Sequence, residues 1–144
     1  MLRSTLIRTI TTAPAVTATP SSTLAQVAKL MESYNIHHVP IVDQNGHPLG
    51  IISQVDLHQI SNWRSHFGHL ADSAEKENKQ LFDSLLAEEI MSSPVITIHE
   101  DAAVKEAADL VERYRVHCLP VVDSTGKAIG ILTPHDLLRL AYNS

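Results

Sequence analysis

The chain has 144 residues, of which 44% are hydrophobic and 19% charged, and its formal net charge is −5. This composition predicts a folded globular protein, and a negative charge without a Lys/Arg cluster argues against a nucleic-acid-binding surface. No apolar stretch approaches the roughly 20 residues of a membrane span, so we expect no membrane association. The lone Cys118 excludes an internal disulfide and suits a reducing, cytoplasmic compartment.

Residues 1–12 carry two arginines, several hydroxyl side chains and no acid, a composition similar to that of an organelle-targeting peptide. We instead expect this segment to be part of the fold, because its pattern reappears 80 residues later. The matching pairs are Ile10/Ile90, Pro14/Pro94 and Val16/Ile96.

The chain repeats itself with this offset of 80 residues. Residues 34–57 align without a gap with residues 114–137, and 14 of 44 positions are identical between residues 17–60 and 97–140. The identical pairs include Tyr34/Tyr114, His37/His117, Pro40/Pro120, Asp43/Asp123, Gly46/Gly126, Gly50/Gly130 and Asp56/Asp136. Because many of these are polar or turn-forming residues, the match reflects two copies of one folding unit.

Each copy begins with a predicted strand and helix. A short apolar stretch, 16–18 or 95–98, leads to Ser21 or Asp101, whose side-chain oxygen can cap a first helical turn. Apolar residues then recur at i, i+3, i+4 and i+7, which predicts an amphipathic helix. These residues are Leu24, Val27, Ala28 and Met31 in the first copy and Val104, Ala107, Ala108 and Val111 in the second.

A hairpin and a second helix follow in each copy. The apolar runs 39–42 and 119–122 predict strands, and each precedes an Asp-x-x-Gly turn in which Gly supplies a positive φ. The returning strands are 49–53 and 129–133, and a helix opens at the next aspartate. The chain therefore has the element order of an α+β fold with two equivalent units.

We expect the first unit over residues 1–61, an insert over 62–80 and the second unit over 81–144. The insert is polar and has no counterpart in the other copy, which indicates a helical extension and linker. The alternative is a partner or dimer surface built on Trp63 and Phe67.

The pattern h-x-H-x-h-P-h-V-D, a Gly-bearing turn and then G-h-h-[ST]-x-x-D-L occurs in both copies. It resembles a tandem pair of cystathionine β-synthase (CBS) domains, or Bateman module, over all but residues 61–79. The length and insert are similar to stand-alone bacterial pairs of the acetoin-utilisation type. The resemblance implies two β-α-β-β-α units related by a pseudo-twofold axis, with sheets packed together and helices outside. It also implies two clefts between the units that bind AMP, ADP, ATP or S-adenosylmethionine, and a homodimer.

Asp56 and Asp136 are the strongest candidates for ligand binding. Each opens a helix three residues after a hydroxyl, Ser53 or Thr133, and a carboxylate can accept from both hydroxyls of a ribose. The alternative is an acid that only complements the helix dipole. The resemblance favours the ribose-binding role. The hydroxyls suit a ribose or phosphate oxygen, or a helix cap.

The resemblance implies further ligand contacts in each copy. Thr17 and Thr97 align with a threonine that lines the adenine or ribose pocket, although by themselves they would be ordinary strand residues. Pro40 and Pro120 belong to the same motif and are included in the expected site.

His37 and His117 resemble the phosphate-contacting histidines in gamma subunits of AMP-activated protein kinase. An arginine often follows those histidines, whereas this chain has His38 and Cys118. With His38 and Cys118 in place of two arginines, the chain lacks two cations at these positions, which argues against tight polyphosphate binding. Cys118 lies in an apolar run, so we expect an inert core residue; the alternative is a thiol activated by His117.

The second copy carries more cations than the first. Arg113, Arg115, Lys127 and Arg139 stand opposite Ser33, Asn35, His47 and Gln59. Arg139 follows Asp136 by three residues, about one helical turn, where it could reach a phosphate, the alternative being a solvated face. We hypothesise that the Asp136 cleft prefers a phosphorylated nucleotide and that the Asp56 cleft is weaker, empty or selective for a nucleoside-like ligand.

His58, His66 and His69 form the best candidate metal cluster, but no cysteine or paired carboxylate completes a ligand set, so we expect no metal site. The absence of a nucleophile–base pair and of a G-x-x-x-x-G-K loop argues against an enzyme or a required cofactor. We expect a cytoplasmic, energy-sensing regulatory module that binds an adenosine nucleotide and signals to a protein partner by conformational change. The alternative is a dimerisation or interaction module with degenerate clefts.

Overall fold

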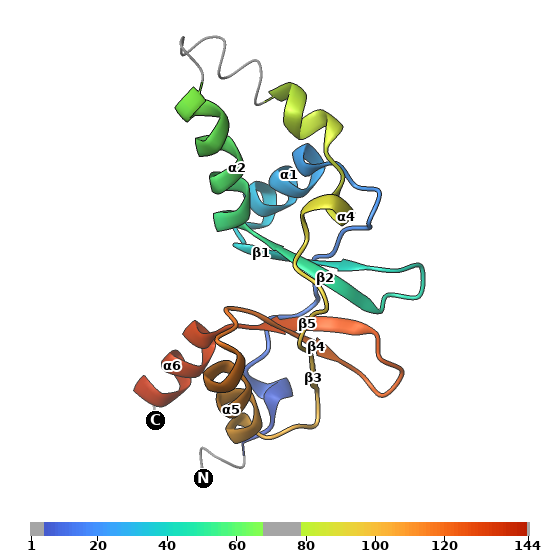
Figure 1. Ribbon diagram of the computed structural model, residues 1–144. Coiled ribbons are helices and arrows are strands. Elements are labelled where there is room, and N and C mark those ends of the chain that lie inside the picture. Colours follow the sequence, from blue (N-terminus) through green and yellow to red (C-terminus); the bar gives the residue numbers. More distant parts are fainter. Residues whose placement is uncertain (1–4, 68–78, 144) are drawn as a thin grey trace. The chain divides into compact units, whose positions relative to one another are not determined.

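The computed structural model describes residues 5–67 and 79–143, with only the backbone given for residues 62–67. The chain forms two compact units, each built from a small sheet with helices packed on it (Figure 1). The predicted α+β class is confirmed. None of the described helices is both long and apolar enough to cross a membrane.

The first repeat contains the predicted helix, hairpin and helix. They are α1 (Leu24–Tyr34), β1 (His38–Val42), β2 (Pro48–Ser53) and α2 (Gln54–Phe67). Ala18 forms an isolated parallel bridge with Ile41, so the chain before α1 lies along β1 as a leading strand would. The turn between β1 and β2 places Gly46 at φ +84°, where glycine avoids a steric cost, as the Asp-x-x-Gly pattern predicts.

The second repeat has the same order with a short additional strand. Its elements are β3 (Ile98–His99), α5 (Val104–Tyr114), β4 (Leu119–Val122), β5 (Ala128–Leu132) and α6 (Pro134–Tyr142). β4 lies between β3, to which it is parallel, and β5, to which it is antiparallel. Gly126 in its hairpin turn has φ +87°, so the two turns share one backbone conformation.

The predicted caps of the first helices, Ser21 and Asp101, are wrong. α1 begins after Thr23, whose Oγ1 accepts from the N–H of Gln26 at 3.1 Å while Gln26 Oε1 accepts from the N–H of Thr23 at 2.9 Å. α5 begins after Ala103, which has no side-chain cap. The helices start two residues late because a turn, at 20–21 and at 100–101, precedes each of them.

The segment before the first repeat packs on the second repeat. It contains the 3-10 helix η2 (Ile7–Thr9), and Ile7 is fully buried in the hydrophobic core of the second repeat. The N–H of Ile131 in β5 donates to the carbonyl of Thr12 at 3.0 Å. Residues 5–15 therefore belong to the compact unit that holds α5 and α6.

The segment before the second repeat packs on the first repeat in the corresponding way. It contains α4 (Ala87–Ile90), which buries Ala87 completely in the hydrophobic core of the first repeat. The N–H of Ile51 in β2 donates to the carbonyl of Ser92 at 3.1 Å. The core of the second repeat therefore includes Ile7, which precedes the first repeat, and the core of the first repeat includes Ala87, which precedes the second.

The compact units consequently differ in chain range from the sequence repeats. One unit combines Val16–Asp43 with Leu49–Ser93, and the other combines Met1–Ala15, Gln44–Pro48 and Pro94–Ser144. The predicted boundaries 1–61 and 81–144 follow the repeat, and they stay a prediction. The partner surface predicted on Trp63 and Phe67 lies outside the described side chains.

We predict that Gly130→Ala destabilises the protein by about 1–3 kcal/mol, because the added methyl group overpacks the contact between β5 and the N-terminal segment. A Cβ on Gly130 would lie 2.8 Å from the carbonyl oxygen of Thr12 and against Cγ2 of Thr11. Urea unfolding followed by circular dichroism measures the change. Ser124→Ala, in the exposed turn between β4 and β5, is the control and should cost less than about 0.5 kcal/mol. A Gly130→Ala protein as stable as the wild type would contradict the close packing of Thr11 and Thr12 on β5.

Candidate functional site

In each predicted site, the hydroxyl and the carboxylate each accept a hydrogen bond from the backbone N–H of the other residue at the start of the second helix. In the first repeat, the N–H of Ser53 donates to Oδ2 of Asp56 at 2.8 Å, and the N–H of Asp56 donates to Oγ of Ser53 at 3.1 Å. In the second repeat, the corresponding distances between Thr133 and Asp136 are 2.9 and 3.4 Å. Each pair forms a reciprocal cap, which satisfies N–H groups that a helix leaves open.

The cap holds the carboxylate at the point where a strand ends and a helix begins. A carboxylate offers about four lone-pair positions, so a backbone N–H on Oδ2 leaves acceptor capacity for other donors. Both sites therefore combine a fixed carboxylate with the N-terminal end of a helix. This arrangement can accept hydroxyl groups and can stabilise a nearby negative charge.

The two carboxylates differ in burial and in charge compensation. Asp136 is only 6% exposed, and the Arg139 guanidinium donates to its Oδ1 at 2.6 Å. The Thr133 hydroxyl donates to Oδ2 at 3.1 Å. Asp56 is partly exposed, and Gln59 stands where the second repeat has Arg139. The predicted proximity of Arg139 to Asp136 is present, and contact of Arg139 with a phosphate stays a prediction.

His37 is bound to the start of α2 rather than to Asp56. Its Nδ1 lies 2.6 Å from Oε1 of Gln54, and its carbonyl accepts from the Gln54 N–H at 2.8 Å. His37 and Gln54 line a pocket of about 430 Å³ whose other walls come mainly from α1 and α2. Ser53 and Asp56 are not among the residues that line it.

His117 has a different environment from His37. It is exposed, and Pro134 replaces the glutamine that holds His37. In the described part of the chain, His117 has no hydrogen-bond partner. The repeated histidines therefore present different hydrogen-bonding groups, which a comparison of Gln54 with Pro134 could have indicated from the sequence.

Of the remaining predicted residues, Pro40 lies in β1 and Pro120 in β4, and the two threonines lie just before residues that pair with these strands. Thr17 precedes Ala18, whose N–H donates to the carbonyl of Pro40 at 3.0 Å, so Thr17 runs alongside β1. Thr97 likewise precedes β3, which pairs with β4 and thus runs beside Pro120. Both prolines are fully buried. Ligand contacts for these four residues stay predictions.

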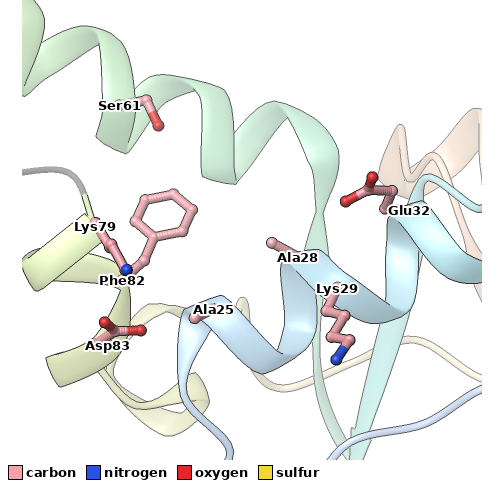
Figure 2. A pocket seen from close by; sticks show the side chains of 8 residues that line it. All are labelled: Ala25, Ala28, Lys29, Glu32, Ser61, Lys79, Phe82 and Asp83. Atoms are coloured by element: carbon pink, nitrogen blue, oxygen red, sulfur yellow. The ribbon is translucent and has the colours of Figure 1, made fainter. Parts of the chain in front are cut away.

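A second pocket lies in the same unit as His37 and was not predicted. It has a volume of about 490 Å³ and lies between α1, α2 and the helix of residues 79–84 (Figure 2). The Phe82 ring points into it, toward Ala28 on α1 and Ser61 on α2. Phe82, Ala28 and Ser61 also line the pocket at His37. Phe82 carried no motif signal, since it lies beside the insert, outside the stretch of strongest repeat similarity.

Cys118 is a buried core residue, as predicted. It is 5% exposed, and burial raises the pKa of its thiol from 9.0 to about 12, with the nearby Asp136 carboxylate adding to the rise. The thiol therefore stays protonated at neutral pH, and the alternative of a thiol activated by His117 is not supported.

The candidate metal cluster lies only partly within the described residues. The His66 side chain and all of His69 lie outside the described residues. Among the residues that the structure does describe, no group of three His, Cys, Asp or Glu side chains could hold a metal ion.

The repeated strand–helix–hairpin–helix unit, with a hydroxyl and a carboxylate at its second helix, defines a tandem of small α+β domains. The family model of the CBS domain matches residues 7–61 and again residues 87–143. The chain belongs to the CBS domain family, which confirms the resemblance seen in the sequence.

The chain is also similar to longer curated proteins. It is 34% identical over 136 residues to the L-aspartate semialdehyde sulfurtransferase of Methanocaldococcus jannaschii, covering 94% of this chain and 23% of that protein. It is 32% identical over 139 residues to an uncharacterized protein of Methanopyrus kandleri, covering 96% of this chain and 64% of that protein. The chain therefore spans less than two thirds of the length of either relative.

Solved CBS structures match most of the chain. The CBS domain of a CBS-domain-containing membrane protein from Sphaerobacter thermophilus is 35% identical with a TM-score of 0.81, covering 96% of this chain and 89% of that one. The CBS domain pair of protein MJ0100, in complex with 5′-methylthioadenosine and S-adenosyl-L-methionine, is 32% identical with a TM-score of 0.74, covering 96% and 97%. CBSX2 in complex with AMP, at 22% identity and a TM-score of 0.73, shares the fold. As a CBS pair, the chain is a regulatory module and not a catalytic domain.

We predict that native Cys118 does not react with Ellman's reagent at pH 8, because only the thiolate attacks and burial keeps the thiol protonated. Full reaction should appear only after denaturation in urea. Since Cys118 is the single cysteine, the absorbance change reports on it alone. Rapid labelling of the folded protein would contradict the burial.

The same pKa shift makes stability depend on alkaline pH. The raised pKa of folded Cys118 contributes stability that is fully present below about pH 9 and is lost as the pH rises toward 12, because the unfolded state releases the proton first. Cys118→Ala should therefore reduce the fall in unfolding free energy between pH 8 and 10, by up to about 1.4 kcal/mol per pH unit above pH 9.

Proposed function

We propose that the chain is a regulatory module that binds adenosyl ligands at the starts of α2 and α6. The observation that carries this proposal is the hydroxyl–carboxylate pair, built twice, in a chain 32% identical to a CBS pair solved with 5′-methylthioadenosine and S-adenosyl-L-methionine. In this proposal Asp56 and Asp136 accept the two hydroxyls of a ribose, with Ser53 and Thr133 beside them.

Thr17 and Thr97 would line the adenine or ribose side of each site, and Pro40 and Pro120 would shape the sheet beneath it. His117 would contact a phosphate through a ring N–H. The energy-sensing role proposed for the module follows from a preference for one adenosine nucleotide over another.

The two sites would differ in the ligand they prefer. Arg139 lies beside Asp136, and its side chain is 58% exposed in spite of the ion pair, so it can turn toward a phosphate while remaining near the carboxylate. The first repeat has Gln59 at this position. We therefore assign a phosphorylated nucleotide to the Asp136 site and a nucleoside-like ligand to the Asp56 site.

Signalling would follow from differential binding. A ligand shifts a conformational equilibrium only as far as it binds one arrangement more tightly than another. At the Asp136 site, a phosphate would compete with the carboxylate for Arg139. We propose that this exchange of partners is the local change read by a second copy of the chain or by another protein, in the cytoplasm.

A second candidate function is an interaction module with empty sites. The exposed apolar side chains on α6 favour it, since Leu138 is 69% and Tyr142 is 91% exposed on one helix, four residues apart. The three hydrogen bonds that Asp136 accepts within the protein, from the Thr133 N–H, the Thr133 hydroxyl and the Arg139 guanidinium, are also compatible with a purely structural role.

We predict that calorimetric titration with AMP, ADP, ATP and S-adenosylmethionine shows saturable binding, and that Asp136→Ala abolishes one site or weakens it at least tenfold. A charged acceptor is worth about 1.5–3 kcal/mol per hydrogen bond, which supports this magnitude. Because Asp136 also caps α6, Asp136→Asn serves as a second variant that keeps part of the cap. Asp109→Ala on exposed α5 is the matched control. Folded, nucleotide-free protein that binds none of the four ligands would favour the interaction module.

We predict that Arg139→Gln, which installs the residue of the first repeat, weakens AMP binding at the Asp136 site about tenfold more than adenosine binding. The reason is that a guanidinium pairs with a phosphate and has no such partner in adenosine. Calorimetry with both ligands measures the difference. Arg113→Gln is the control, since Arg113 lies over the Tyr114 ring at 5.9 Å on the exposed side of α5. Equal losses for AMP and adenosine would contradict the phosphate role.

A further inference from the structure

Gln54 fixes which ring nitrogen of His37 carries the proton. The Gln54 Oε1 atom can only accept a hydrogen bond, and it lies 2.6 Å from Nδ1 of His37. The bond therefore requires a proton on Nδ1, and a neutral His37 is left with a lone pair on Nε2. In this neutral tautomer, Nε2 of His37 can accept a hydrogen bond from a ligand and cannot donate one.

The pocket beside His37 also favours donors over anions. Glu32 lies in its wall, and no lysine or arginine is among the described residues that line it. His58 also lines the pocket. A phosphate placed here would face a carboxylate and a lone pair, whereas an ammonium or N–H group would be paired by both.

The second repeat lacks this arrangement. Pro134 stands in the place of Gln54 and offers no side-chain acceptor. His117 can therefore adopt either tautomer and present an N–H to a ligand. Arg139 adds a cation on α6, the helix that Pro134 begins.

We propose that Gln54 is a positioning residue that makes the first site select adenosine derivatives with a cationic or N–H-donating 5′ substituent over those ending in a phosphate. The proposal rests on the proposed function, because it assumes that His37 faces the 5′ end of a bound adenosyl ligand. Gln54 acts through His37, and its own contact with the ligand is not required.

The tautomer is tested first, without any ligand. Long-range ¹H–¹⁵N correlation spectra of the imidazole nitrogens at pH 8 should show His37 protonated on Nδ1 in the wild type and no such preference in Gln54→Leu. Gln54→Glu, which keeps an oxygen acceptor, should retain a proton on Nδ1. Gln59→Leu, the same change at an exposed position of α2, should leave the spectrum of His37 unaltered. A wild-type His37 protonated on Nε2 alone would overturn the proposal.

Selectivity is then measured with 5′-amino-5′-deoxyadenosine, AMP and adenosine. Backbone amide shifts of Asp56 and Leu57 report on the first site, and those of Asp136 and Leu137 report on the second. The first site should bind the 5′-amino compound more tightly than AMP, and Gln54→Leu should reduce that preference about fivefold, the value of one net hydrogen bond. The second site should keep its own preference in this variant.

The outcomes separate this proposal from the one on which it rests. Equal binding of the amine and AMP at the first site, or a preference that Gln54→Leu leaves unchanged, would overturn the role of Gln54 while the proposed function stands. No binding of any of the three compounds at either site would refute the proposed function, and with it the selectivity.

Discussion

The reciprocal hydrogen bonds between the residue before each second helix and the aspartate three positions later are the constraint on which fold and site both depend. Ser53 with Asp56, and Thr133 with Asp136, end a strand and start a helix at the same point. A cap of this kind is worth about 1 kcal/mol, so the helix forms without assistance from a ligand. The carboxylate is therefore held in place beforehand, and a ribose would meet an acceptor whose conformational freedom has already been lost.

The copies share this backbone but differ in how much of the carboxylate they bury. A carboxylate as enclosed as Asp136 needs a partner, since an unpaired buried charge is costly, and Arg139 supplies it. Asp56 remains partly exposed, and an uncharged residue, Gln59, stands where the second repeat has Arg139. The repeats also differ at the position of Gln54, which is Pro134 in the second repeat. In the proposal above, Gln54 makes His37 a hydrogen-bond acceptor, whereas Pro134 leaves His117 able to donate. Two positions on one helix thus distinguish an acceptor-rich site from a cationic one.

Much of this architecture could be predicted because its signals are local. The helical spacing of Leu24, Val27 and Met31 and the positive φ of Gly46 and Gly126 depend on neighbours within a few residues. The caps at Ser21 and Asp101 were wrong because two residues of turn precede each helix, and turn length is weakly encoded in sequence.

The exchange of leading segments could not be predicted from the repeat. The alignment of Ile10 with Ile90 is equally compatible with packing on either copy, and only the tertiary contacts place Ile7 in the core of the second repeat. The hydrogen bond between His37 and Gln54 is likewise nonlocal, because the two residues are 17 positions apart in the sequence. Long-range contacts such as these depend on how elements meet, and a periodic pattern carries no information about that.

The exchange also gives a local ligand a physical route to the whole chain. Ile7 completes one core and Ala87 the other, so neither repeat retains its full core when the two are separated in sequence. Burying a side chain such as isoleucine is worth about 1.5–3 kcal/mol, and a ligand at 100 times its dissociation constant stabilises the state it binds by about 2.7 kcal/mol. These magnitudes are comparable. If the proposed function holds, binding at the start of α6 would supply free energy comparable to that of burying Ile7, whose segment is also held by backbone hydrogen bonds from Thr12 and Ala15 to β5 and leads directly into the first repeat.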